Sequence, residues 1–213
     1  MKRAIIGHWQ TVPAIGQLAV DNKIEAYNFS QGTLVHWFRA LAGHKLGVFT
    51  DIGLETFLDP RQLGGKLNDV TKEDLVKLIE VEGHEQLFYP TFPVQVAFLR
   101  GTYADESGNI TMDEEIGPFE SISVAQAVHN CGGKVVVQVK DVVAHGSLDP
   151  RMVKIPGIYV DDVVIAAPED HQQTYDCQYD PSLSGEHRAP EGAADEVLPM
   201  SAKKIIGRRA LWN

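Results

Sequence analysis

The chain has 213 residues, of which 44% are hydrophobic, so it can form one domain with a substantial buried core. Its formal net charge of −10 argues against nucleic acid or an anionic membrane as a partner, because both require a basic face. No apolar run reaches the ~20 residues of a membrane-spanning helix, and the run after Lys2 and Arg3 is too short for a signal peptide.

The first part of the chain alternates strand and helix patterns. Ala4–Trp9 has the apolar character of a buried strand, and Pro13–Val20 predicts a helix with proline in its first turn. A short extended segment then ends at Asn28, and the polar turn Ser30–Gly32 follows it.

Apolar residues with helical spacing come next. They occupy positions i, i+3, i+4 and i+7, namely Leu34, Trp37, Phe38 and Leu41. Gly43 is expected to end this helix, and Leu46–Ile52 predicts a strand that ends at Gly53. Strand, turn, helix and strand form a unit that places polar groups at the carboxyl edge of a parallel sheet, where ligands bind. Gln31 is the uncharged side chain at that edge that both donates and accepts hydrogen bonds.

The middle of the chain predicts a capped helical turn at Thr71–Asp74 and a hairpin centred on Gly83. The remaining elements are strands at Val94–Arg100, Lys134–Val139 and Ile158–Ala166 and a helix at Ser121–Asn130. The last two strands are rich in Val and Ile, as strands buried on both faces are. The alternation predicts an α/β fold with an open, mostly parallel sheet and flanking helices.

The composition changes after Pro168. Residues 168–200 are rich in proline and carboxylates and predict a partly irregular linker, and residues 201–213 predict a C-terminal helix. We therefore expect an α/β domain over residues 1–167, then the linker, then the helix. Cys131 and Cys177 lie far apart and outside any Cys-x-x-Cys pattern, which favours two reduced thiols in a cytoplasmic protein.

Several segments in a fixed order carry a resemblance to one known family. They are Ser30–Leu34 (SQGTL), Asp51–Gly53, Phe57–Asn68 (FLDPRQLGGKLN), Arg100–Asn109 (RGTYADESGN), Ile122–Gly133 (ISVAQAVHNCGG) and Asp149–Val160 (DPRMVKIPGIYV). This chain resembles the family I coenzyme A transferases, and the propionate/acetate CoA-transferases in particular, from Met1 to about Tyr175. Members of that family are much longer, so the chain resembles an internal segment of the amino-terminal half.

The resemblance implies an activity. Family members move CoA between a short-chain acyl-CoA and a free carboxylate through a glutamyl intermediate, and the attacking glutamate is expected outside this chain. Carried over by motif, Gln31 lines the reaction site, and Gly32, Gly53 and Glu55 belong to the acyl-CoA site. A helix-start residue that bonds to the backbone is the other interpretation of Gln31. Acyl-CoA and a small carboxylate are substrates, and neither a bound cofactor nor a metal is expected.

Two acidic residues bear on the expected catalytic and substrate-binding sites. Glu115 stands in a Glu-Ile-Gly sequence that imitates the nucleophile motif, but its position matches the amino half of the family, and we do not expect it to be catalytic. Glu55 stands where close relatives carry glycine, and its charge is expected to repel an anionic substrate.

Other functions stay open at this stage. The chain is also compatible with a non-enzymatic binding or assembly module on the same scaffold, or with an enzyme similar to sugar-phosphate isomerases. The basic residues Lys203, Lys204, Arg208 and Arg209 form either a solvated helix face or a contact to CoA phosphates. The family's missing first βα unit predicts an exposed sheet edge, and therefore self-association or a complementing CoA-transferase chain.

Overall fold

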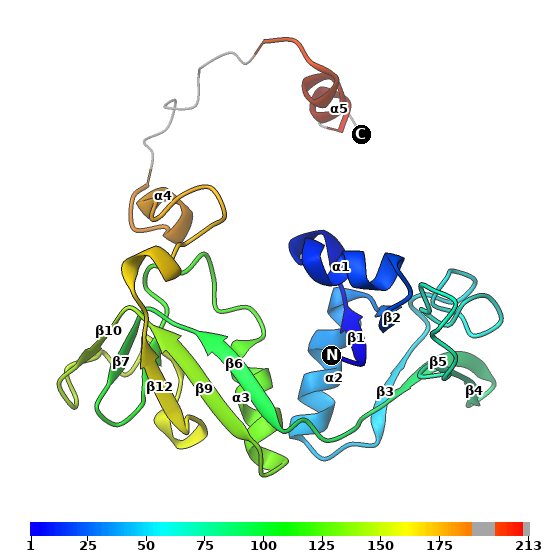
Figure 1. Cartoon of the computed structure of the whole chain (residues 1–213), viewed down its shortest axis with the longest axis horizontal. Helices are drawn as coiled ribbons and strands as arrows, with labels where there is room; N and C mark the ends of the chain where they lie inside the picture. Colours follow the sequence, from blue (N-terminus) through cyan, green and yellow to red (C-terminus); the bar gives the residue numbers. More distant parts are fainter. Residues whose placement is uncertain (189–198, 211–213) are drawn as a thin grey trace.

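Two small parallel sheets form the centre of the molecule in the computed structural model, which describes residues 1–188 and 199–210 (Figure 1). The first sheet pairs β1 (Arg3–Ile6) with β2 (Glu25–Asn28), and α1 (Pro13–Val20) connects them. The second has the order β12-β9-β6, formed by β6 (Val96–Arg100), β9 (Lys134–Val139) and β12 (Asp162–Ile165). Helices α2 (Gln31–Ala42) and α3 (Ser121–Asn130) pack against each other beside these sheets.

Two further sheets flank this centre. One is antiparallel, with the order β3-β5-β4, and consists of β3 (Gly47–Thr50), β4 (Lys77–Val81) and β5 (His84–Pro90). The other has the order β10-β7-β8-β11 and consists of β7 (Tyr103–Asp105), β8 (Ile110–Thr111), β10 (Asp141–Val143) and β11 (Val153–Ile155).

The apolar residues that fix these elements lie in two main cores. In one, Val135, Val137 and Val139 of β9 are fully buried against α3, since alternate residues of a strand point to the same face. In the other, Trp37 and Leu41 of α2 pack with residues of β2 and β5. Helix α3 connects the two cores, because Ala125 and Val128 belong to the first and Ala127 to the second.

The structure confirms the predicted α/β class and most elements. Helices α1 and α3 have the expected bounds, Gly43 is the C-cap of α2, and β4 and β5 form the hairpin around Gly83. The four predicted parallel strands exist as β1, β6, β9 and β12, although Trp9 and Ile158 belong to short 3-10 helices rather than strands.

Three expectations about arrangement are wrong. β1 pairs with β2 and not with the β12-β9-β6 sheet, so no single open sheet joins the predicted strands. β3 pairs antiparallel with β5, the second strand of the β4–β5 hairpin, and not parallel with β2. No helical turn forms at Thr71–Asp74, where the Thr71 hydroxyl instead accepts a hydrogen bond from the backbone N–H of Ala26 at 2.7 Å.

The region after residue 167 contains short helices. Pro168–Asp170 is a 3-10 helix, α4 spans Pro181–Ser184, and α5 spans Ala202–Ala210 with no buried residue. The rest of the predicted linker at 189–198, and the predicted helix end at 211–213, lie outside the described residues. The domain limits at 167 and 200 stay predictions. In the part of the chain that is described, no helix is long and apolar enough to cross a membrane.

Candidate functional site

Gln31 lies where β1 and β2 both end. It is the first residue of α2, whose N-cap Ser30 accepts a hydrogen bond from the backbone N–H of Thr33 at 3.3 Å. Gly7 follows β1 on the neighbouring strand, and a Cβ atom at Gly7 would lie 2.4 Å from Gln31 Oε1. Glycine at position 7 therefore leaves room for the amide at the carboxyl edge of this parallel pair.

Glu120 completes this arrangement, and the sequence analysis missed it. Gln31 Nε2 donates a hydrogen bond of 2.8 Å to Glu120 Oε1. Glu120 is the N-cap residue of α3, but its side chain makes no cap hydrogen bond there. Its carboxylate links the amino ends of two helices, a place that favours negative charge. An acidic residue directly before the predicted helix Ser121–Asn130 was the available signal, but the sequence does not show that α2 and α3 are neighbours.

Gly53 and Glu55 lie in the loop that follows β3. Gly53 has φ of 103° and packs against Leu58 and Leu87, and Glu55 has φ of 62° with its backbone N–H donating to Asp59 Oδ2 at 3.0 Å. The expected meeting of this turn with the Gln31 turn at one edge of a parallel sheet is wrong, since β2 and β3 belong to different sheets. The binding roles of Gln31, Gly32, Gly53 and Glu55 stay predictions.

The backbone explains why glycine suits position 55. A residue other than glycine in the left-handed region costs about 1 kcal/mol. We expect Glu55→Gly to raise the free energy of unfolding by up to about 1 kcal/mol, with part of the gain offset by the greater freedom of glycine in the unfolded chain. Urea unfolding checks this. Glu55→Ala is the control, because it removes the charge but keeps the strain, and an equal gain in that variant would contradict the explanation.

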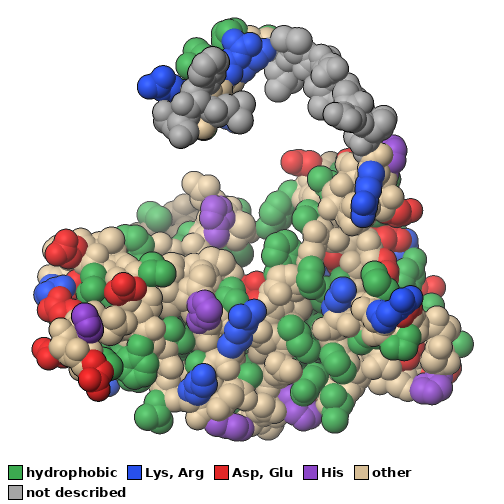
Figure 2. Space-filling view, turned by 180° about the vertical axis from the view of Figure 1, so that it is seen from behind, with side chains coloured by type: hydrophobic (Ala, Val, Ile, Leu, Met, Phe, Trp, Pro, Cys, Tyr) green, Lys and Arg blue, Asp and Glu red, His purple; other side chains and the backbone are tan. Residues whose placement is uncertain are grey.

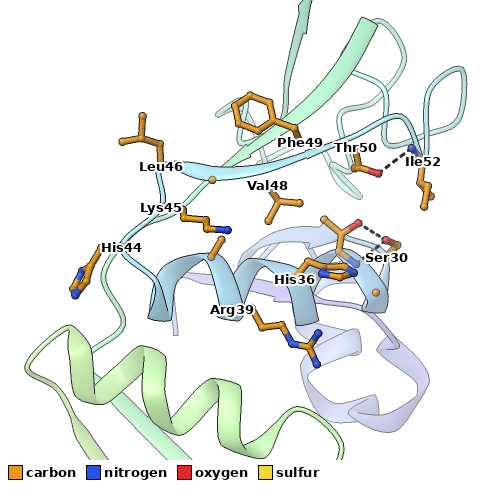
Figure 3. A pocket seen from close by; sticks show the side chains of 14 residues that line it. Ser30, His36, Arg39, His44, Lys45, Leu46, Val48, Phe49, Thr50 and Ile52 are labelled. Carbon is orange, nitrogen blue, oxygen red and sulfur yellow. Dashed lines mark hydrogen bonds between the residues drawn. The ribbon is translucent and has the colours of Figure 1, made fainter. Parts of the chain in front are cut away.

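A groove of about 970 Å³ runs between α2 and β3 (Figure 3). Gly32 lines it in the first turn of α2, and a Cβ atom there would meet no other atom within 4 Å. Four basic residues also line it, namely His36, Arg39, His44 and Lys45. Figure 3 shows His36 and Arg39 projecting from α2 and Val48 pointing from β3 towards the helix.

The groove carries basic side chains in a chain whose formal net charge is −10. None of its lining residues is acidic, and no ion pair within residues 1–188 and 199–210 occupies the Arg39 or Lys45 side chain. Figure 2 shows acidic side chains gathered at the edge formed by the β4–β5 hairpin, and Lys, Arg and His side chains over the middle of that face. The groove is therefore suited to an anionic ligand.

Glu115 is partly buried and held by its neighbours. Its side chain is 13% exposed, its Oε1 lies 3.0 Å from Arg100 Nε, and His171 Nε2 lies 3.7 Å from the same oxygen. Burial, followed by the Arg100 charge, lowers the pKa of His171. The ion pair with Arg100 favours a structural role for Glu115. Across the described residues, no group of three His, Cys, Asp or Glu residues is placed to hold a metal ion.

Comparison with known proteins decides the family. A family model described as Coenzyme A transferase matches residues 1–166. The chain belongs to the coenzyme A transferase family.

Two curated relatives define the branch. The chain is 42% identical over 213 residues to the acetate CoA-transferase YdiF of Escherichia coli (strain K12), covering 100% of this chain and 40% of the relative. It is 45% identical over 199 residues to the caffeate CoA-transferase of Acetobacterium woodii, covering 92% of this chain and 38% of the relative. This coenzyme A transferase chain thus spans about 40% of the length of these relatives and matches an internal segment.

A solved structure supports the fold. The acyl-CoA transferase YdiF from Escherichia coli O157:H7, in a thioester complex with CoA, is similar to this chain with a TM-score of 0.88 and 42% sequence identity. The match covers 99% of this chain and 42% of the solved chain. The elements described above are therefore those of a coenzyme A transferase.

Proposed function

We propose that this chain is the segment of a CoA-transferase that binds acyl-CoA and orients its thioester for transfer of CoA to a free short-chain carboxylate. The nucleophilic glutamate lies outside these residues, and the complete enzyme works in the cytoplasm. The observation that carries this proposal is the amide of Gln31, held at the carboxyl edge of β1 and β2 in a chain of this family.

The chemistry defines what Gln31 contributes. A glutamate oxygen attacks the thioester carbon and expels CoA thiolate, which leaves an acyl-glutamyl anhydride. The thiolate then attacks the glutamyl carbonyl, releases the first carboxylate and forms a glutamyl thioester, and the second carboxylate reverses both steps. Each attack places negative charge on a carbonyl oxygen. One Gln31 N–H bonds to Glu120, so the second remains to donate to that oxygen.

The groove between α2 and β3 supplies a place for the charged end of CoA. Gly32 opens the groove beside Gln31, and Arg39 and Lys45 add two cations without acidic neighbours among its lining residues. Phosphate oxygens form strong, charge-assisted hydrogen bonds with such groups. We infer that the CoA phosphates bind along α2, with the thioester directed towards Gln31.

Calorimetric titration of CoA into the chain tests this. We expect the double variant Arg39→Ala/Lys45→Ala to lower CoA affinity at least ten-fold. The matched control is Arg208→Ala/Arg209→Ala, which removes the same charge from α5 and should leave the affinity unchanged. A loss of CoA affinity in the α5 variant alone would show that the CoA phosphates bind to that helix and not in the groove. Absence of CoA binding by the unaltered chain would contradict the groove assignment.

A non-enzymatic binding or assembly module is the second candidate. The observation that favours it is Glu55, an added carboxylate in the loop expected to face the substrate. A turnover assay with propionyl-CoA and acetate separates the candidates once the remaining CoA-transferase sequence is supplied. Exchange in the assembled enzyme supports the transferase. CoA binding without exchange supports the module.

A further inference from the structure

Residues 171–178, called the strap below, link the part of the chain that carries β1 to the part that carries β6. A backbone hydrogen bond of 3.0 Å from Gln173 to Gln178 closes a turn in the strap. At the tip of this turn, the Tyr175 hydroxyl donates a hydrogen bond of 2.7 Å to the Thr11 carbonyl oxygen. Figure 1 shows α4, which follows the strap, and α1, which follows Thr11, at the same end of the molecule.

The tip of the strap contacts the loop that lies against Gln31. Thr11 is the last residue of the 3-10 helix Trp9–Thr11, which follows β1 and Gly7, and the Gln31 side chain packs against Gly7. Tyr175 is 84% exposed, so the hydrogen bond to Thr11, and not burial of the ring, holds the tip in place. This contact can therefore open without exposing apolar surface.

The base of the strap contacts the loop that leads to α3. Gln173 Nε2 donates a hydrogen bond of 2.6 Å to the backbone carbonyl of Glu114, which lies in this loop. The loop ends at Glu120, the residue that accepts the hydrogen bond from Gln31. The strap therefore joins the two loops that position the Gln31 amide, one through Gly7 and the other through Glu120.

A buried histidine begins the strap. His171 is 8% exposed, and neither of its ring nitrogens has a hydrogen-bond partner in the described part of the chain. Arg100 donates to the His171 backbone carbonyl at 3.3 Å and to the Glu115 carboxylate at 3.0 Å. The neutral ring thus lies beside a guanidinium that also holds the strap backbone. A positive charge on the ring would repel that guanidinium and weaken the attachment.

The surroundings of His171 disfavour its charged form. The charged groups that face the ring are Arg100 at the end of β6, Glu114 and Glu115 in the loop before α3, and Lys140 after β9. Burial, followed by the Arg100 charge, holds the pKa of His171 below its usual value near 6.5, although the two glutamates act in the opposite direction. The attached strap is therefore most stable above about pH 6.5 and loses stability as the pH falls below that value, because a released ring binds the proton more tightly.

We propose that the strap closes over the Gln31 site, fastened by Tyr175 to Thr11, and that protonation of His171 releases it. This inference rests on the proposed function and adds regulation of the same site. Closure keeps water from the thioester, so that a carboxylate attacks it instead. When the strap is open, a water oxygen bonds to the thioester carbon and the carbon–sulfur bond breaks. The CoA thiolate takes one proton of that water, and the other passes to solvent.

Hydrogen exchange of the unaltered chain tests the release without any transferase activity. After correction for intrinsic rates, the backbone amides of Gln173 and Thr174 should exchange about three- to ten-fold faster at pH 5.5 than at pH 7.5, because one proton sets the upper limit. Amides of Lys134–Val139 should not change. His171→Phe keeps a buried ring that does not titrate and should remove the pH dependence. The control His145→Gln removes an exposed histidine and should keep it.

A pair of tyrosine variants tests the tip of the strap. Tyr175→Phe removes the hydroxyl that donates to Thr11, and it should speed exchange of the Val12 amide at least three-fold at pH 7.5. Tyr179→Phe is the matched control, because its hydroxyl donates to Glu186 and not to the loop after β1. Once the remaining CoA-transferase sequence is supplied, Tyr175→Phe should raise the ratio of acyl-CoA hydrolysis to CoA transfer at least three-fold, and Tyr179→Phe should leave this ratio unchanged.

The outcomes separate the strap from the transferase. Exchange of the strap amides that does not depend on pH, a pH dependence that persists in His171→Phe, or equal effects of the two tyrosine variants would overturn the proposal. Acid-dependent exchange in the strap without any CoA transfer by the assembled enzyme would support the release and refute the proposed function. CoA transfer with an unchanged hydrolysis ratio in Tyr175→Phe would support the transferase and refute the closure.

Discussion

Asp59→Asn is expected to lower the free energy of unfolding by about 2 kcal/mol, the size of a lost set of hydrogen bonds to a buried charge. The Asp59 side chain is 1% exposed and accepts hydrogen bonds from the Arg61 guanidinium and from the backbone N–H groups of Glu55 and Arg61. An asparagine of the same size loses the charge and offers only one acceptor oxygen. Urea unfolding at pH 7 measures the difference between variant and parent.

The chain contains its own control for this experiment. Asp149 and Arg151 repeat the Asp-Pro-Arg sequence with the same backbone and guanidinium hydrogen bonds, but Asp149 is 40% exposed. Asp149→Asn should leave the urea midpoint nearly unchanged, because solvent screens an exposed pair. Equal losses at both sites would show that burial is not the cause.

Urea unfolding of the parent and of Asp59→Asn at acid pH gives a second test. The Arg61 hydrogen bonds hold the pKa of Asp59 well below its usual range, against the opposing effect of burial. A group with a lowered folded-state pKa stabilises the protein above its unfolded pKa, near 4, and loses that contribution as the pH falls through the folded value. The stability difference between parent and Asp59→Asn should therefore shrink at strongly acid pH.

Gly157→Ala is expected to lower the free energy of unfolding by about 3 kcal/mol. A Cβ atom at Gly157 would lie 2.0 Å from the carbonyl oxygen of Ser107, a backbone atom that cannot turn away. The backbone N–H of Gly157 also donates to Asn109 Oδ1 at 2.9 Å. The clash would separate two segments that this bond joins.

Thermal unfolding by circular dichroism checks this prediction. The control is Gly207→Ala, since a Cβ atom at Gly207 meets no atom within 4 Å and alanine favours helix. An unchanged melting temperature for Gly157→Ala would mean that the loop at Ser107 moves easily.

The elements that were predicted well from the sequence are those whose own residues carry the signal. Pro13 marks the start of α1, and the apolar spacing after Ser30 marks α2. The Val-rich run of β9 predicts a strand without reference to distant residues. Which strands pair with each other does depend on distant residues. Nothing near Leu46–Ile52 shows that β3 pairs with β5, about forty residues later, and the expected parallel unit was wrong for that reason.

The residues of the candidate site show the same difference between features that local sequence predicts and features that depend on tertiary packing. The family motif placed Gln31 at a carboxyl strand edge, and the structure has it there beside Gly7. Its bond to Glu120 spans 89 residues and depends on the packing of α2 against α3, which sequence spacing does not encode. His36 and Arg39 are three residues apart on an exposed helix face. Basic residues with this spacing most often form a helix face that contacts only solvent. Only the neighbouring β3 turns that face into a groove.

The basic groove also affects how fast an anion reaches it. The chain carries a formal net charge of −10, so a multiply charged anion is repelled at long range and attracted only near the groove of α2 and β3. Salt at about 0.15 M shortens the range of both effects to about 8 Å. Moderate ionic strength therefore removes most of the long-range repulsion before it weakens the short contacts. The association rate of such an anion rises first with added salt and falls only at higher concentrations.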